Sequence, residues 1–254
     1  MPETLQERSE RIAAEGIFLG GPTVDFERVG RLSFDVLLRE GLRPGSRVLD
    51  FGCGALRVGY WLMRFLEPGC YYGIEPNSAM LQVGLDRLLE PDVVARAQAH
   101  FADNDDFDLS VFGVAFDYVL ARSIWTHTSR EQISTMLGSF AASSAPAGML
   151  LATYHPATRM VKLGRRFPVL GVLATSTALG TFAPSISRLS RSASRAGYAG
   201  EQWVGRSHES DQVGVVRHSL GWIVQEAARH GLSARLAPHP IVNQQYWLKV
   251  TRTH

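Results

Sequence analysis

The sequence feature that most constrains the fold is a glycine-rich turn in the stretch VLDFGCGALRVG, residues 48–59. A short β-branched run, SRVLDFG, leads into Gly52 and Gly54, and the amphipathic run LRVGYWLMRFL follows them. This order predicts a strand, a turn and a helix. Because glycine has no Cβ, such a turn lets backbone N–H groups and the helix N-terminus come close to a ligand. The turn therefore predicts a site of the kind that several nucleotides use.

Strands and helices alternate through the rest of the chain. The expected strands are at residues 70–76, 97–102, 116–121 and 147–155, the expected helices are at 77–90, 129–143 and 219–231, and a closing pair of strands is expected at 233–238 and 245–252. Ser129 and Gln132 have capping-box spacing, and Asn77 or Ser78 is the expected cap of the helix before it. The alternation predicts a doubly wound α/β sheet with a ligand at the carboxyl ends of its strands.

The 254 residues are interpreted as one domain, because no long polar, Pro-rich or Ser-rich linker divides them. Apolar residues at spacings of three and four predict two N-terminal helices, within residues 4–16 and 25–41. The stretch from Pro156 to Gly214 loses this pattern and is too long for a plain connection. The expected parts are an N-terminal helical cover (1–45), a cofactor-binding core (46–155), a lid or substrate-selectivity insertion (156–214), and a final helix with closing strands (215–254).

Composition narrows the possible partners. The formal net charge is +2 and the basic residues are spread along the chain, which argues against nucleic acid as a partner. The first twenty residues mix both signs of charge and lack the apolar segment of a secretory signal, so a cytoplasmic location is expected. Cys53 and Cys70 do not have metal-ligand spacing, and no metal site is expected.

The insertion contains an apolar stretch at residues 167–184. Gly, Ser and Thr interrupt it and it is short for a membrane span, so no transmembrane segment is expected. Three interpretations stay open: a hydrophobic cover over a bulky substrate, interfacial contact with lipid through Arg165 and Arg166, and a plain packing helix.

Two residues near the glycine turn distinguish between nucleotide ligands. A dinucleotide fingerprint needs a glycine three positions after Gly54, where this chain has Arg57. Asp50, two residues before Gly52, would place a buried carboxylate beside a pyrophosphate of like charge. A cationic ligand suits Asp50 better, and S-adenosylmethionine carries a sulfonium and an ammonium group but no phosphate. Glu75, at the end of the second strand, suits ribose hydroxyls with either ligand.

From about Arg47 to His155 the chain resembles the class I S-adenosylmethionine-dependent methyltransferases. VLDFGCGALRVG is similar to their first motif, and YYGIEPN is similar to their ribose-binding strand end. NDDFDLSVFGVAFDYVLARSIWTH is similar to the segment with the adenine contact and the fourth strand, and HPIVNQQYWLKVTR resembles the closing antiparallel strands. The resemblance implies a Rossmann-like, doubly wound, mostly parallel seven-stranded sheet with an antiparallel last strand, N-terminal helices and a lid insertion before the last helix.

The same resemblance implies where the cofactor binds. Asp105 or Asp106, with a preference for Asp106, would accept a hydrogen bond from the adenine amino group, and Phe107 would stack on the ring or donate its N–H. Arg122 and Ser123 would contact the methionine end. The full set of expected cofactor-binding residues is Asp50, Gly52, Cys53, Gly54, Glu75, Pro76, Asp105, Asp106, Phe107, Arg122 and Ser123.

Two histidines are candidates for a catalytic base. His127 lies in ARSIWTHTS, which follows the fourth strand and leaves the sheet where a substrate would lie. A neutral imidazole with an unperturbed pKa of about 6.5 suits removal of a proton from a substrate hydroxyl. The structural alternative is that His127 binds a loop and packs near Trp125. His155, at the end of the fifth strand, is the second candidate.

The sequence therefore predicts an S-adenosylmethionine-dependent methyltransferase that transfers a methyl group to a small-molecule acceptor and releases S-adenosylhomocysteine. The preferred subclass is O-methylation of a natural product or a sugar-containing metabolite in secondary metabolism. The alternatives are an NAD-dependent oxidoreductase and a non-catalytic cofactor-binding or scaffold protein. A homodimer is an open alternative to a monomer.

Overall fold

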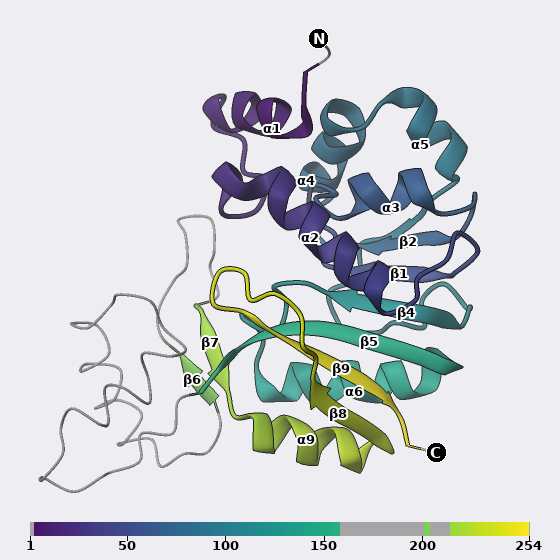
Figure 1. The fold of residues 1–254 in the computed structure, drawn as a ribbon, viewed down its shortest axis with the longest axis vertical. Helices are drawn as coiled ribbons and strands as arrows, with labels where there is room; N and C mark the ends of the chain where they lie inside the picture. The colour runs from purple at the N-terminus through teal and green to yellow at the C-terminus, as the bar shows by residue number, and fades with distance from the viewer. Residues whose placement is uncertain (1–2, 158–200, 204–213, 254) are drawn as a thin grey trace, which may run out of the picture.

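A mostly parallel sheet organises the fold (Figure 1). The structure, a computed structural model, describes residues 3–157, 201–203 and 214–253. Five parallel strands lie in the order β3-β2-β1-β4-β5. Their bounds are β1 (Val48–Phe51), β2 (Tyr71–Ile74), β3 (His100–Ala102), β4 (Phe116–Ala121) and β5 (Ser144–Pro156). Beyond β5 lie β9 (Tyr246–Arg252), antiparallel to it, and β8 (Leu232–Leu236), antiparallel to β9. These seven strands confirm the predicted Rossmann-like sheet and its antiparallel closing strand.

A short antiparallel pair, β6 (Glu201–Trp203) and β7 (Val216–His218), extends this sheet. Strand β7 runs parallel to the last two residues of β5, and the N–H of Val216 donates to the Thr126 carbonyl at 2.8 Å. The pair is an addition that the sequence pattern does not predict, because a three-residue strand has no readable period. It places β7 beside the loop that follows β4.

The predicted lid falls mostly outside the described residues. Arg165, Arg166 and the apolar stretch 167–184 all lie there, so the lid and interfacial interpretations stay predictions. Within the part of the chain that the structure describes, no helix combines the length and the apolar character needed to cross a bilayer.

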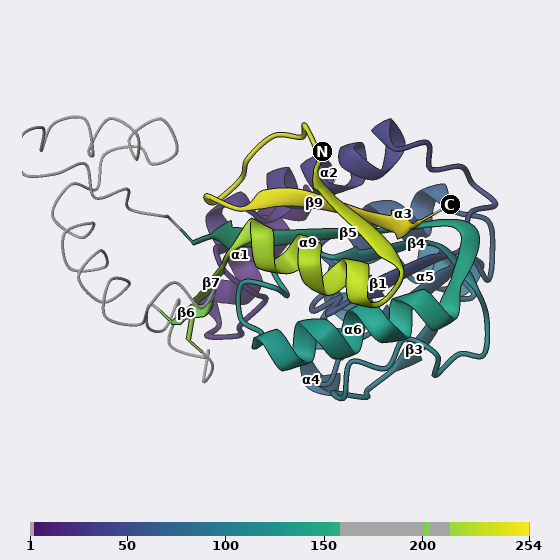
Figure 2. The same cartoon turned by 90° about the horizontal axis from the view of Figure 1, so that it is seen from below.

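Helices cover both faces of the sheet (Figures 1 and 2). Leu37 of α2 belongs to the same buried cluster as Val48, and Met136 of α6 to the same cluster as Leu49. Successive strand residues point to opposite faces, so β1 is buried on both sides, as expected for a central parallel strand. The helices are α1 (Leu5–Ala14), α2 (Phe26–Arg39), α3 (Gly59–Phe65), α4 (Ser78–Val83), α5 (Pro91–Ala97), α6 (Arg130–Ser143) and α9 (Leu220–Arg229), with a 3₁₀ turn η1 (Thr23–Asp25) and a π turn η2 (Gly84–Leu88).

Local cap signals confirm several helix ends. Ser129 and Gln132 form the predicted capping box of α6, and Asn77 caps α4 by accepting from the Met80 N–H. Helix α5 was not predicted, although Pro91 at its first position is a recognised start signal. Because α5 runs to residue 97, β3 begins at residue 100 and not at the predicted residue 97.

The N-terminal helices pack against the glycine turn. Leu5, Leu19 and Phe26 form a buried cluster with Ala55, which directly follows the turn, and with Leu88. This packing holds residues 18–22 over the carboxyl edge of the sheet, beside the loops that follow β1 and β2.

Candidate functional site

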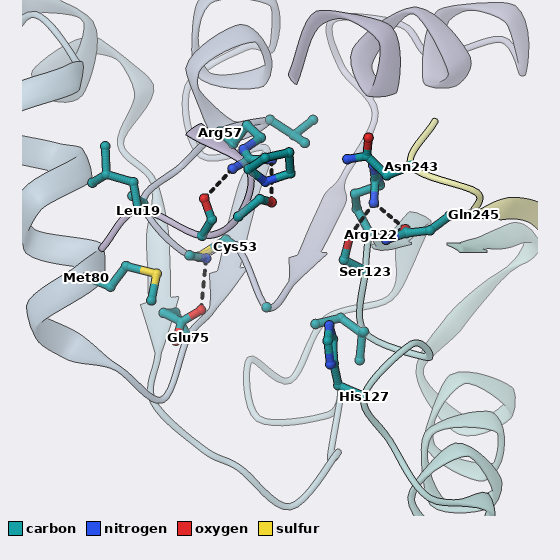
Figure 3. Close-up of a pocket in the computed structure, with 18 of the residues that line it drawn as sticks. Leu19, Cys53, Arg57, Glu75, Met80, Arg122, Ser123, His127, Asn243 and Gln245 are labelled. Atoms are coloured by element: carbon teal, nitrogen blue, oxygen red, sulfur yellow. Dashed lines mark hydrogen bonds between the residues drawn. The ribbon is translucent and has the colours of Figure 1, made fainter. Parts of the chain in front are cut away.

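A cavity of about 750 Å³ lies at the carboxyl ends of β1, β2, β4 and β5 (Figure 3). Its walls come from the loops after those strands, from the N-terminal segment 18–22 and from the turn at 243–245. Figure 3 shows Met80 and Glu75 on one side of the pocket, and Arg122 and Asn243 on the other. Doubly wound sheets bind ligands at this edge, where the polar ends of several strands converge.

The glycine turn needs glycine at its first position. Gly52 has φ +70°, a left-handed conformation that side chains disfavour. A Cβ placed on Gly52 would lie 2.2 Å from Cδ1 of Ile124, so the Ile124 side chain would have to move. The turn thus brings bare backbone to the pocket, as predicted.

Glu75 holds this turn in place. One carboxylate oxygen accepts from the Gly54 N–H at 2.9 Å, and the other accepts from the Asn77 N–H at 2.9 Å. Each oxygen keeps a second lone pair for a ligand hydroxyl. Glu75 lines the pocket, with Met80 beside the turn: a Cβ on Gly54 would lie 3.4 Å from its sulfur.

Asp50 lies at the floor of the pocket and is only 2% exposed. The Tyr71 hydroxyl donates to its carboxylate at 3.1 Å. Burial, with a smaller contribution from the negative charge of Glu75, raises the pKa of Asp50 to about 7 against the opposing effect of the Tyr71 hydrogen bond. A cation in the pocket would stabilise the ionised form of Asp50, whereas an anion would not.

Cys53 also lines the pocket, between the two glycines. Its thiol is buried, and burial together with the charge of Asp50 raises its pKa well above the usual value. The thiolate is therefore disfavoured, and Cys53 acts as a small packing residue.

Arg57 ties the N-terminal segment to the glycine turn, a role that the sequence analysis missed. Its guanidinium donates to the carbonyl of Gly20 at 2.7 Å and to that of Gly21 at 3.2 Å. It also lies 4.6 Å from the centre of the Phe26 ring. Burial lowers the pKa of Arg57 to about 10, so it stays charged at neutral pH. In the sequence, Arg57 is noticeable only because it stands at the position where the dinucleotide-binding fingerprint has a glycine.

Arg122 and Ser123, both predicted site residues, line the pocket with Gln245. Arg122 donates to the Ser123 hydroxyl and to the Gln245 side-chain oxygen. The buried Thr153 hydroxyl donates to the same Gln245 oxygen at 2.6 Å and accepts from the Ser123 N–H at 2.8 Å. Burial lowers the pKa of Arg122 to about 9, which leaves a charged guanidinium in the pocket at neutral pH. Gln245 was not predicted, because a loop residue has no periodic pattern.

Both candidate histidines line the pocket. Nδ1 of His155 lies 3.1 Å from the Gln244 carbonyl, so it is the protonated nitrogen and Nε2 is the acceptor. Burial, with smaller contributions from the charges of Arg217, His127 and Arg122, lowers the pKa of His155 to about 4 against the opposing effect of the Gln244 hydrogen bond. The His127 N–H donates to the Ile124 carbonyl at 2.9 Å, which fixes its place in the loop after β4.

Four predicted site residues do not line this pocket: Pro76, Asp105, Asp106 and Phe107. Asp106 is exposed and folds back on its own loop, accepting from the Asn104 side chain at 2.8 Å and from the Asp108 N–H at 3.0 Å. The Phe107 ring lies 5.3 Å from that of Phe51. Local polar turns of this kind satisfy the acidic run without a ligand. The predicted adenine contacts stay predictions.

No group of three or more His, Cys, Asp or Glu side chains that could hold a metal ion occurs among the described residues. The charged groups of the pocket are the carboxylates of Asp50 and Glu75 and the guanidinium of Arg57 around the glycine turn, and Arg122 with two imidazole groups at the other end. This donor set suits a ligand that itself carries separated charges.

One protein family model matches part of this chain. Residues 48–148 match the model of a protein family described as a methyltransferase domain. Among curated proteins, no sequence matches this chain.

Solved structures with a similar fold are methyltransferases. Magnesium protoporphyrin IX methyltransferase from Synechocystis PCC 6803, solved with SAH bound, is 18% identical with a TM-score of 0.57, and the match covers 97% of this chain and 94% of that chain. An O-methyltransferase family protein from Burkholderia thailandensis is 15% identical with a TM-score of 0.55, covering 100% and 64% of the two chains. A glycopeptide N-methyltransferase complexed with S-adenosylmethionine is 12% identical with a TM-score of 0.55, covering 88% and 94%. At these identities the likeness shows the fold.

Proposed function

We infer the function from the premise that this chain carries a class I S-adenosylmethionine-dependent methyltransferase domain at residues 48–148. The protein is then an enzyme whose cofactor is S-adenosylmethionine, and we propose that it methylates a small molecule. The observation that carries the proposal is the meeting of Asp50, Glu75 and the glycine turn at one end of a single pocket. The alternative function, an NAD-dependent oxidoreductase, has no support from the matched domain.

The pocket suits a cationic nucleoside. Asp50 is a buried carboxylate whose ionised form needs a nearby positive charge, and an ammonium or sulfonium group provides one. Glu75 has lone pairs left for two ribose hydroxyls, as predicted. Arg122 is a buried cation in the same pocket, and the carboxylate of a methionine end is a suitable partner for it. Segment 18–22 forms one wall of the same pocket.

When bound, S-adenosylmethionine supplies a methyl group on a positively charged sulfur. The chain's own contribution is to hold the acceptor in line with that methyl group, which by itself supplies much of the rate. We propose that His127 accepts the proton of an acceptor hydroxyl. His155 is the weaker candidate, because its lowered pKa of about 4 makes Nε2 a poor base.

The finer parts of the proposal rest on the sequence. They are O-methylation of a natural product or sugar-containing metabolite, a place in secondary metabolism, and a cytoplasmic location. The relatives in the comparison include both O- and N-methyltransferases, so the acceptor atom is the first thing to test.

The test begins with thermal melts of the full chain with S-adenosylhomocysteine, S-adenosylmethionine or NAD. A ligand at about 100 times its dissociation constant adds roughly 2.7 kcal/mol to the free energy of unfolding, which shifts the melting temperature by several degrees. We expect the two adenosyl sulfur compounds to raise the melting temperature and NAD to leave it unchanged. No effect of the adenosyl compounds would refute the proposal.

Product formation is the second stage. Release of S-adenosylhomocysteine is followed with panels of hydroxyl, amine and carboxylate acceptors. Turnover with hydroxyl acceptors alone would support O-methylation. Binding of cofactor without turnover on any panel would instead favour the non-catalytic scaffold alternative.

A further inference from the structure

The pocket has a second charged end, around the junction of β5 and β7. His155 and Arg217 are direct register partners in these two parallel strands. Register partners on neighbouring strands point to the same face of a sheet, so the Arg217 side chain lies on the same face as His155. His155 lines the pocket, and Arg217 lies next to it, beside the lining residues. Val215 also lines the pocket and lies two residues before Arg217, which gives the same face independently.

Arg217 has one buried donor that is not satisfied. Its Nε is buried and has no hydrogen-bond partner. Within the described ranges, no carboxylate lies within ion-pair distance of Arg217 or Arg122. Burial lowers the pKa of Arg217, because a charged guanidinium that is removed from water and has no counter-ion is less stable than one in water.

The two ends of the pocket thus differ in charge: the glycine-turn end holds two carboxylates beside Arg57, whereas the other end has cationic groups and no lining carboxylate among the described residues. The lining carboxylates are Asp50 and Glu75, both at the glycine turn. Figure 3 shows Glu75 across the pocket from Arg122 and His127. The charges of Arg217, His127 and Arg122 all lower the pKa of His155, so these groups share one electropositive region. A neutral acceptor would leave the buried Nε of Arg217 without a hydrogen-bond acceptor, whereas an anion would supply one.

We propose that the acceptor carries an anionic group, a carboxylate or a phosphate, and that Arg217 binds it beside His155 at the β5–β7 junction. The proposal rests on the proposed function and specifies the substrate class. A guanidinium presents a planar fork of donors that matches both anions, and charge-assisted hydrogen bonds of this kind are strong where water is excluded. Arg122 remains for the methionine end of the cofactor, so the two arginines bind different anions.

The test uses the full chain saturated with S-adenosylhomocysteine and three probes of similar shape: benzoate, phenyl phosphate and benzamide. Affinities are measured by calorimetry or ligand-observed NMR. We expect benzoate or phenyl phosphate to bind at least tenfold more tightly than neutral benzamide, and the better of the two acids indicates the natural anion. Equal binding of all three probes would overturn the proposal.

The matched variants are Arg217→Gln and Arg235→Gln. Arg235 is an exposed arginine on β8 and serves as the control for loss of one positive charge. We expect Arg217→Gln to lose at least tenfold in affinity for the preferred acid while its affinity for S-adenosylhomocysteine is unchanged, which also shows that it folds. Arg235→Gln should match the parent chain. Unchanged acid binding in Arg217→Gln would refute the assignment of Arg217.

Two further readouts keep this test separate from the proposed function. Arg217→Lys keeps the charge but loses the fork, so partial acid binding is expected, and this variant replaces Arg217→Gln if the latter does not fold. The titrations are repeated without S-adenosylhomocysteine. Acid binding by a chain that does not bind S-adenosylhomocysteine would refute the methyltransferase proposal and leave the anion site standing.

Discussion

At the scale of single residues, Asp50 links cofactor binding to pH. Its carboxyl is buried beside the glycine turn, and its pKa of about 7 places the proton equilibrium in the neutral range. A cationic ligand favours the ionised form, so binding below pH 7 requires release of a proton. The same residue therefore recognises the ligand and sets the pH at which recognition is strong.

We predict that affinity for S-adenosylhomocysteine rises between pH 6 and pH 8, by up to about tenfold per pH unit below the pKa of Asp50. Calorimetry in buffers of different ionisation enthalpy should show proton release on binding near pH 6.5. Asp50→Asn cannot ionise, so it should bind at least tenfold more weakly at pH 8 and show a flat profile. A pH profile in Asp50→Asn that matches the parent chain would contradict the role of Asp50.

His127 is the second residue-scale prediction. Loss of a positioned general base typically lowers the rate by about 10²- to 10⁴-fold. We expect His127→Ala to lower kcat by at least about 10²-fold with a hydroxyl acceptor, with unchanged affinity for S-adenosylhomocysteine. His155→Gln is the comparison, because it replaces a pocket imidazole whose pKa of about 4 makes it a poor base. An equal loss of kcat in both variants would argue that the two residues shape the pocket and that neither transfers the proton.

At the scale of elements, Arg57 joins α3 to the segment between α1 and α2. The guanidinium bonds to the carbonyls of Gly20 and Gly21 and lies over the Phe26 ring. The Arg57 backbone also packs tightly against α2. A Cβ on Gly30 of that helix would lie 2.3 Å from the Arg57 carbonyl oxygen, so the contact needs a glycine. Arg57 therefore holds the cover over this end of the pocket together with the buried cluster around Leu19.

We predict that Arg57→Ala lowers the free energy of unfolding by about 1–3 kcal/mol, since two charge-assisted hydrogen bonds are lost. Segment 18–22 would then cover the pocket less well, so S-adenosylhomocysteine should dissociate about tenfold faster. Urea unfolding and stopped-flow dissociation measure the two effects. Arg31→Ala removes an exposed arginine from α2 and is the control. Unchanged dissociation in Arg57→Ala would show that the segment is held by packing alone.

Some helices and strands were predicted correctly from local sequence patterns, and others were not. Strand β4 spans the predicted residues 116–121, and α6 begins at the predicted capping box, because periodicity and caps act within a few residues. Strand β7 and helix α5 escaped prediction because they are short and their pattern is weak. The predicted loop residues Asp105 and Asp106 do not reach the pocket, because no short-range rule specifies where an acidic loop points.

At the scale of the whole molecule, two pocket residues affect the pH dependence of stability with opposite sign. Burial lowers the pKa of His155 from 6.5 to about 4, so as pH falls through this window the unfolded chain takes up a proton first and stability falls. Burial raises the pKa of Asp50 from 3.8 to about 7, so over nearly the same window the folded chain takes up the proton and stability rises. The two effects partly cancel between pH 4 and pH 6.5.

We predict that single variants expose each effect. Relative to the parent chain, His155→Gln should become more stable as pH falls from 6.5 to 5. Asp50→Asn should be more stable at pH 8 and lose that advantage as pH falls to 5. Urea unfolding at pH 5, 6.5 and 8 gives the differences, in which contributions from other groups cancel. Variant profiles that run parallel to the parent profile would contradict both pKa shifts.

The sequence by itself determined the alternation of strands and helices, the glycine turn and the carboxylates at Asp50 and Glu75, because these follow from periodicity, backbone sterics and charge over short distances along the chain. Tertiary structure alone decided which side chains meet. Gln245 joins Ser123 from 122 residues away, and Arg57 reaches Gly20 across 37 residues. Arg217 lies beside His155 only because β7 pairs with β5. Such meetings depend on how whole elements pack, and no local pattern encodes them.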